Sequence, residues 1–192
     1  MPVAIATVEE FYAHALAIER EAAERYREFE AYFRDHGREI LAGLCANLAG
    51  LEEEHFALLA KESRHRKLPA IADNDYRWLE SGAPEAAARE LFYRIANERQ
   101  LLEVALHAER QAQRFFDWVA LSTPDKHVRS LALEMADEEA QHVRWVEQAI
   151  EYRPSTPLDW NRPAPKRAGT TNISKSIKRT STKRAKATEG RG

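Results

Sequence analysis

The sequence predicts an all-α fold, a bundle of four helices with a long connection between the second and the third. Three observations predict it. The composition favours helix, with many Ala, Glu, Leu and Arg and only 7 glycines in 192 residues. Apolar residues recur every three or four positions over four long stretches. One two-helix pattern occurs twice, and the hydrophobic share of 44% is enough for one sizeable core.

The first hairpin is marked by local signals at both ends of its first helix. Thr7 and Glu10 have the spacing of a capping box, so the first helix is predicted to begin at Thr7. An apolar stripe runs through residues 11–33, and Gly37 then suits a turn because glycine tolerates left-handed backbone. A second stripe over residues 41–59 predicts the second helix.

The second hairpin follows a long connection. Residues 64–84 lack apolar periodicity and contain prolines and an Asp-Asn-Asp run, which is typical of a connection too long for a tight turn. The third helix is predicted over 85–121, with a break near Asn97. Thr123–Pro124 is predicted to cap the fourth helix, which continues until Pro154 stops it.

Six residues carry the candidate chemistry, as two Glu-x-x-His pairs that each follow a lone glutamate, 33 residues earlier in the first half and 30 in the second. They are Glu19, Glu52 and His55 in the first half and Glu109, Glu139 and His142 in the second. Residues i and i+3 share one face of a helix, so each pair can reach one metal ion. The first-half glutamates lie roughly 25 Å from their hairpin turn at about 1.5 Å per residue, and the second-half glutamates match closely. We therefore expect all six to converge inside the bundle.

The chemistry of these groups points to a two-metal site. Four buried carboxylates would lose hydration and repel one another, which costs several kcal/mol per ion unless cations compensate them. Two divalent irons would neutralise the set, and manganese or zinc also fit carboxylate and imidazole ligands, although zinc has no redox chemistry. Small residues one turn from the lone glutamates would leave room for the metals; they are Ala22, Ala23 and Ala112.

Other titratable residues are interpreted as structural. Glu62 and His65 also have the Glu-x-x-His spacing, but they lie in a polar stretch off the apolar stripe and are not predicted to bind metal. Cys45, the single cysteine, is predicted to be a small core residue. His14 and His107 are predicted to lie at the surface, pointing away from the lone glutamates.

The run from Glu19 through Tyr26 to Glu52 and His55 resembles the rubrerythrin diiron domain of the ferritin-like di-iron superfamily, over about residues 8–152. The resemblance implies a ferritin-like bundle with a long crossover and two iron ions. It also implies that Tyr26 supports the site by a hydrogen bond. The implied ligands are Glu19 and His55 terminal on one iron, Glu109 and His142 terminal on the other, and Glu52 and Glu139 bridging.

The sequence departs from that family in three ways. Ala112 stands where rubrerythrins add a glutamate, which weakens the peroxidase assignment. With no cysteine besides Cys45 there is no rubredoxin-like domain, so an external electron donor, such as a rubredoxin-like protein or a flavoprotein reductase, is expected. Glu53 stands where bacterioferritin places its haem-binding methionine, so no haem is expected.

Three function classes follow. The first is a di-iron oxidoreductase, a peroxidase or ferroxidase that oxidises Fe(II) with hydrogen peroxide or dioxygen in oxidative-stress and iron handling. The second is iron sequestration or iron-dependent DNA protection. The third is hydroxylation of an organic substrate. We also expect a homodimer or higher homo-oligomer.

The chain divides into a bundle over residues 1–153 and a tail over 154–192 that is predicted to be disordered. Within 162–192 there are ten Lys or Arg and one acid, Glu189, which leaves the rest of the chain strongly acidic. Such a segment can bind nucleic acid non-specifically. The sequence has no apolar run long enough to cross a bilayer and no signal-peptide pattern at its start, so we expect a cytoplasmic protein without membrane contact.

Overall fold

The computed structural model describes residues 4–72, 75–78 and 94–152, and it confirms the all-α prediction. Within these residues there are four long helices and no strand. The helices are α1 (Val8–Asp35), α2 (Glu39–Ser63), α4 (Glu98–Ser122) and α5 (Lys126–Glu151). None of the described helices combines the length and the apolar character needed to cross a membrane.

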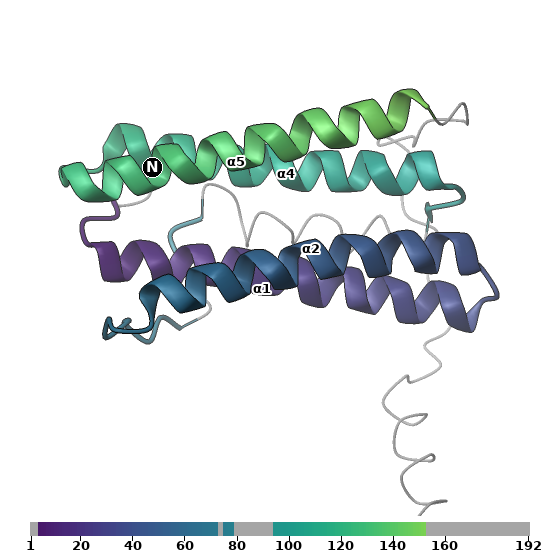
Figure 1. Ribbon diagram of the computed structural model, residues 1–192, viewed down its shortest axis with the longest axis horizontal. Helices are drawn as coiled ribbons and strands as arrows, with labels where there is room; N and C mark the ends of the chain where they lie inside the picture. Colours follow the sequence, from purple (N-terminus) through teal and green to yellow (C-terminus); the bar gives the residue numbers. More distant parts are fainter. Residues whose placement is uncertain (1–3, 73–74, 79–93, 153–192) are drawn as a thin grey trace, which may run out of the picture. The chain divides into compact units, whose positions relative to one another are not determined.

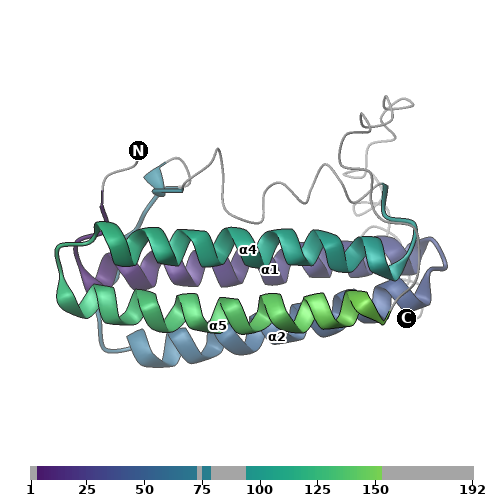
Figure 2. The ribbon, with the colours of Figure 1, turned by 90° about the horizontal axis from the view of Figure 1, so that it is seen from above.

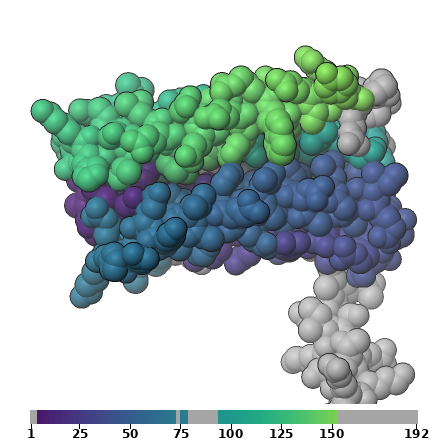
Figure 3. All heavy atoms as spheres, viewed as in Figure 1, coloured from purple at the N-terminus to yellow at the C-terminus, as the bar shows by residue number. Residues whose placement is uncertain are grey.

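The four helices form two antiparallel hairpins that pack on each other (Figure 1). One hairpin is α1 with α2, and the other is α4 with α5. Between hairpins α1 contacts α5 and α2 contacts α4, while α2 and α5 lie on the face seen in Figure 3. α2 and α4 run in the same direction, so the start of α4 lies at the opposite end of the bundle from the end of α2 (Figures 1 and 2), which agrees with the predicted long crossover.

The predicted signals of the first hairpin are confirmed. Thr7 is the N-cap of α1, and its hydroxyl accepts the Glu10 N–H at 3.2 Å. In a complete capping box the Glu10 carboxylate would accept the backbone N–H of Thr7. Here it accepts the N–H of Ala6 instead, at 3.2 Å. Gly37 has a φ of 67°, the left-handed conformation expected after the helix end.

The second hairpin corrects two predicted boundaries. The third helix, α4, starts only after Asn97, whose side chain accepts the Gln100 N–H at 3.0 Å and caps it. The predicted break there is therefore the helix start, and residues 94–97 are not part of α4, while 79–93 lie outside the described residues. The cap of α5 is not Thr123–Pro124 but Asp125, whose carboxylate accepts the N–H groups of His127 and Val128 at 2.7 and 2.9 Å. A carboxylate satisfies two orphan donors and also faces the positive end of the helix dipole.

Buried apolar residues form two core clusters, and the candidate residues lie between them on every helix. One cluster includes Phe29, Phe33, Leu41, Cys45, Leu101 and Val146. The other includes Phe11, Ile18, Phe115, Phe116, Val128 and Met135. The interpretation of Cys45 as a core residue is confirmed, and burial raises the pKa of its thiol to about 12. The polar centre is thus enclosed by apolar packing at both ends.

His14 is fully buried, so its predicted surface position is wrong. Its Nδ1 lies 2.8 Å from the Glu10 carbonyl oxygen, and its Nε2 accepts the backbone N–H of Arg77 at 3.1 Å. The ring also lies near the rings of Tyr76 and Trp78 from the connection. The sequence could not show that this part of the connection returns over α1 and covers the imidazole.

We predict that Asp125→Ala lowers the free energy of unfolding by about 1 kcal/mol, because two backbone N–H groups of α5 lose their acceptor. Urea denaturation followed by circular dichroism would measure the loss. The control is Asp137→Ala in the middle of the same helix, where the carboxylate accepts only from the exposed side chain of Gln141. Equal losses for the two variants would contradict the assignment of Asp125 as the cap.

We predict that His14 makes the fold less stable in mild acid. Burial lowers the pKa of His14 from its ordinary 6.5, although the Glu10 carboxylate acts against this shift, while Arg77 acts with it. The unfolded chain then binds a proton that the folded chain excludes, so the stability due to His14 is present above about pH 6.5 and lost as the pH falls below it.

The measurement is the difference in unfolding free energy between the wild type and His14→Phe from pH 8 to pH 5. The wild-type free energy of unfolding minus that of the variant should decrease as the pH falls, because only the wild type has a buried imidazole that becomes protonated on unfolding. The exposed His65 supplies the control variant His65→Phe, for which we expect a flat difference. A flat difference for His14→Phe as well would refute the prediction.

Candidate metal centre

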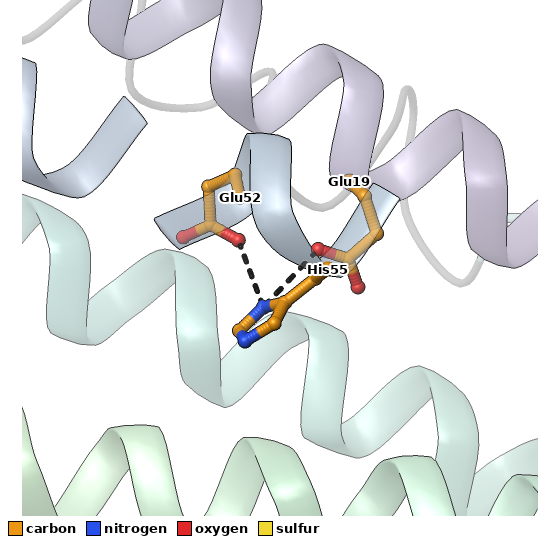
Figure 4. A group of neighbouring side chains, drawn as sticks. All are labelled: Glu19, Glu52 and His55. Atoms are coloured by element: carbon orange, nitrogen blue, oxygen red, sulfur yellow. Dashed lines mark ion pairs between the residues drawn. The ribbon is translucent and has the colours of Figure 1, made fainter. Parts of the chain in front are cut away.

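The first cluster joins residues from both helices of the first hairpin. Glu19 comes from α1, and Glu52 and His55 come from consecutive turns of α2. The Nδ1 atom of His55 lies 3.7 Å from an oxygen of Glu19 and 3.7 Å from an oxygen of Glu52 (Figure 4). Both carboxylates are buried, whereas 26% of the His55 side chain is exposed. The imidazole is therefore the part of this cluster nearest to solvent.

The second cluster repeats this arrangement in the other hairpin. Glu109 comes from α4, and Glu139 and His142 come from consecutive turns of α5. The Nδ1 atom of His142 lies 3.3 Å from Glu109 and 3.4 Å from Glu139. Again the carboxylates are buried and the imidazole is 25% exposed. The internal repeat seen in the sequence is thus also a repeat of geometry.

The two clusters meet through their imidazoles. The rings of His55 and His142 stack with centroids 4.7 Å apart and planes 4° apart. Within each cluster the candidate ligand atoms all lie within 4.8 Å of one another. The structure therefore brings together all six residues that the sequence singled out, one glutamate from each of four helices.

The electrostatics of the centre follow from burial and from the mixture of acids and imidazoles. Burial raises the pKa of Glu19 to about 7, and it raises the pKa of Glu139 well above its ordinary value. Interaction with the carboxylates of Glu19 and Glu52 raises the pKa of His55 to about 10. Burial opposes a similar shift in His142, but the neighbouring Glu109 and Glu139 raise its pKa to about 11. Without metal, positive imidazoles therefore offset part of the carboxylate charge.

The donor set fits metal ions. The Oε1 atom of Glu19 is buried and has no hydrogen-bond partner, and such an orphan acceptor costs at least about 1–3 kcal/mol. Beside the lone glutamates the chain has the small buried side chains of Ala22, Ala23 and Ala112. The two groups of two carboxylates and one imidazole could each hold a metal ion. Iron, manganese and zinc all suit these ligands, so the donor set does not identify the metal.

Tyr26 breaks the symmetry between the two halves. It is buried, its ring lies 6.3 Å from that of Phe29, and it belongs to the core cluster that contains Phe29 and Leu101. Its counterpart in the second repeat, Phe116, belongs to the other cluster and cannot donate a hydrogen bond. Support of the site by the Tyr26 hydroxyl stays a prediction.

One region beside the centre was missed by the sequence interpretation. A cavity of about 110 Å³ reaches His55, and Glu62 lies on its lining. The sequence interpretation left Glu62 and His65 out of the metal centre, and among the described residues neither belongs to a metal-ligand group. Glu62 nevertheless accepts a hydrogen bond from the hydroxyl of Tyr12 at 3.4 Å. The sequence did contain a signal for the position of Glu62: it follows His55 by two helical turns and therefore lies on the same face of the helix.

Comparison with known proteins supports the fold and assigns no activity. No family model matches the chain, and no curated protein matches it. The chain is similar to an uncharacterized conserved protein from Magnetospirillum magnetotacticum MS-1, whose crystal structure was determined at 2.00 Å resolution. The two are 29% identical with a TM-score of 0.61, and the match covers 80% of this chain and 99% of that one.

Proposed function

We propose that this chain is a di-iron carboxylate redox protein of the rubrerythrin-like type that reduces hydrogen peroxide or dioxygen. One observation carries the proposal. Two equivalent groups, each of two buried carboxylates and one imidazole, meet through stacked imidazoles in the middle of the bundle. Such a set has the charge and the donor types for two adjacent divalent ions.

The ligand roles follow the resemblance. Glu19 and His55 would hold one iron, Glu109 and His142 the other, and Glu52 and Glu139 would bridge the two. Iron held there would supply redox chemistry: two Fe(II) would provide the two electrons that, with two protons, convert one hydrogen peroxide to two waters.

The chain itself contributes position and environment. Each carboxylate projects from a helix of at least 25 residues, and side chains cap the N-termini of α1, α4 and α5, which helps to hold the backbone in place. The apolar clusters on both sides keep bulk water from the buried oxygens, which strengthens their interaction with cations. Because each bridging glutamate comes from a different hairpin, the two metals would also join the hairpins. The single Cys45 leaves the chain without a dithiol or cysteine-bound iron, so an external reductase or rubredoxin-like donor is part of this proposal.

The other two function classes are distinguished by the cavity at His55. Its volume of about 110 Å³ is far below the roughly 300 Å³ at which pockets begin to hold drug-sized molecules. At His55 this favours a small oxidant over an organic substrate for hydroxylation, and the larger cavity of about 740 Å³, lined by Arg20, Ala23 and Phe56 among others, includes none of the six candidate ligands. Iron sequestration is the second candidate, favoured by the carboxylates of Glu62, Glu134 and Glu138 on the cavity at His55.

We predict that Glu52→Ala with His55→Ala removes at least one of two metal ions per chain. The variant loses a bridging and a terminal ligand together, so neither ion keeps its full set. The chain supplies a matched control in Glu62→Ala with His65→Ala, which removes the same residue types at the same spacing outside the centre. Metal content after equilibration with Fe(II) under anaerobic conditions is the measurement, with circular dichroism to confirm folding. The same metal content in both double variants would overturn the proposed centre.

We predict that protein loaded with two Fe(II) per chain is fully oxidised by about one hydrogen peroxide per chain, because each peroxide accepts two electrons. Stopped-flow absorbance, with peroxide and dioxygen mixed separately, gives the preferred oxidant. Continued peroxide consumption when a chemical reductant is added would establish turnover. Retention of many irons per chain as mineral would instead favour sequestration, and absence of any oxidation would exclude both.

A further inference from the structure

The cavity beside the metal centre connects a candidate ligand to the protein surface. Residues of α1, α2 and α5 line it, and its volume is about 110 Å³. His55 is the one candidate ligand on this lining. Its side chain is also much more exposed than Glu19 and Glu52, which it contacts. An ion at this imidazole is therefore one side chain away from the buried carboxylates.

Three carboxylates stand on the same lining, all on exposed residues. They belong to Glu62 of α2 and to Glu134 and Glu138 of α5. These two helices lie side by side on the face shown in Figure 3. Some exposed acids elsewhere on the described surface pair with arginines, as Glu53 does with Arg27 and Glu147 with Arg110. Within the described residues, none of the three cavity glutamates forms such a pair.

One neighbour holds part of this lining in place. The Tyr12 hydroxyl donates to Glu62 at 3.4 Å, so Glu62 is braced by a buried aromatic residue of α1. A nearby arginine, Arg66, lies 5.8 Å from the centre of the Tyr12 ring, but its ion pair is with Glu9 and not with a cavity glutamate. The negative charge at the cavity is therefore left facing solvent. A concave, low-dielectric wall with charge of one sign concentrates ions of the other sign and speeds their entry.

The size of the cavity limits what can pass. At about 110 Å³ it has the volume of a few water molecules, each of about 30 Å³ in the liquid. This is enough for a divalent ion that keeps part of its water shell. Apart from His55, the three glutamates and Tyr12, the lining is apolar, with Leu58 and Met135 among its residues.

We propose that this cavity is the entry route for hydrated divalent cations to the metal centre, with Glu62, Glu134 and Glu138 drawing them in and His55 receiving them. The inference rests on the proposed metal centre and adds how that centre is filled. It concerns the rate of loading, because none of the three glutamates belongs to either ligand group.

The first test removes the charge and keeps the shape. The triple variant Glu62→Gln, Glu134→Gln, Glu138→Gln should take up Co²⁺ about tenfold more slowly at low salt, measured by stopped-flow absorbance, and still bind two ions at equilibrium. The matched control removes three exposed charges that do not line the cavity, as Glu24→Gln, Glu54→Gln, Asp117→Asn. It should load at nearly the wild-type rate. At about 1 M salt the difference between the two triples should disappear, because charge is screened within about 3 Å.

The second test blocks the route without changing charge. Leu58 lines the cavity and is 57% exposed, whereas Leu133 is 54% exposed on α5 and does not line it. We expect Leu58→Trp to slow Co²⁺ loading at every salt concentration and Leu133→Trp to leave it unchanged. Equal loading rates for the charge triple and its control, together with equal rates for the two tryptophan variants, would overturn the route.

The outcomes separate this inference from the function it rests on. If the wild type binds no Co²⁺ at equilibrium, the proposed metal centre itself fails. If it binds two ions and the cavity variants load normally, the centre stands and only the entry route is wrong. Slower loading in the cavity variants with unchanged stoichiometry supports both.

Discussion

The structure depends on one constraint, which is that four carboxylates are buried in the core of a small bundle. An uncompensated buried charge costs several kcal/mol, so such a core needs cations within it. Two imidazoles held against the carboxylates provide this in the metal-free arrangement, as the raised pKa values of His55 and His142 express. The proposed metals would take over the same role with greater charge. The apolar clusters at both ends then have a clear purpose, since they supply the packing that the polar centre cannot.

The duplicated hairpin meets the need for compensating cations by placing the same set of ligand residues in each half. Each half contributes two carboxylates and one imidazole with nearly the same geometry, so charge and ligand number are balanced by construction. The two halves differ outside the ligands, where Tyr26 has Phe116 as its counterpart. The cavity is a second asymmetry, because it reaches His55 and not His142. The duplicated centre thus has this cavity beside one of its two imidazoles, although the two rings are about equally exposed.

Much of the fold could be predicted, and the errors have physical reasons. The cap at Thr7 and the left-handed Gly37 were predicted correctly because both depend on interactions within a few residues. Asp125 was missed as a cap because Thr123 and Pro124 carry an equally good local signal that begins two residues earlier. His14 was wrongly predicted to lie at the surface. The segment that covers its face of α1 is 63 residues away in the chain, so no local pattern around His14 could indicate its burial.

The sequence by itself determined the helical class, the internal repeat and the six candidate ligands, because helical spacing places those residues on inward faces whatever the details of packing. Only the tertiary structure decided the relation between the two halves. The stacking of His55 on His142 depends on how two hairpins pack, which no local pattern encodes. The cavity likewise arises where side chains of α1, α2 and α5 leave space between them. The candidate ligands can thus be identified from the helical periodicity of the sequence, whereas access to them depends on how segments far apart in the chain pack together.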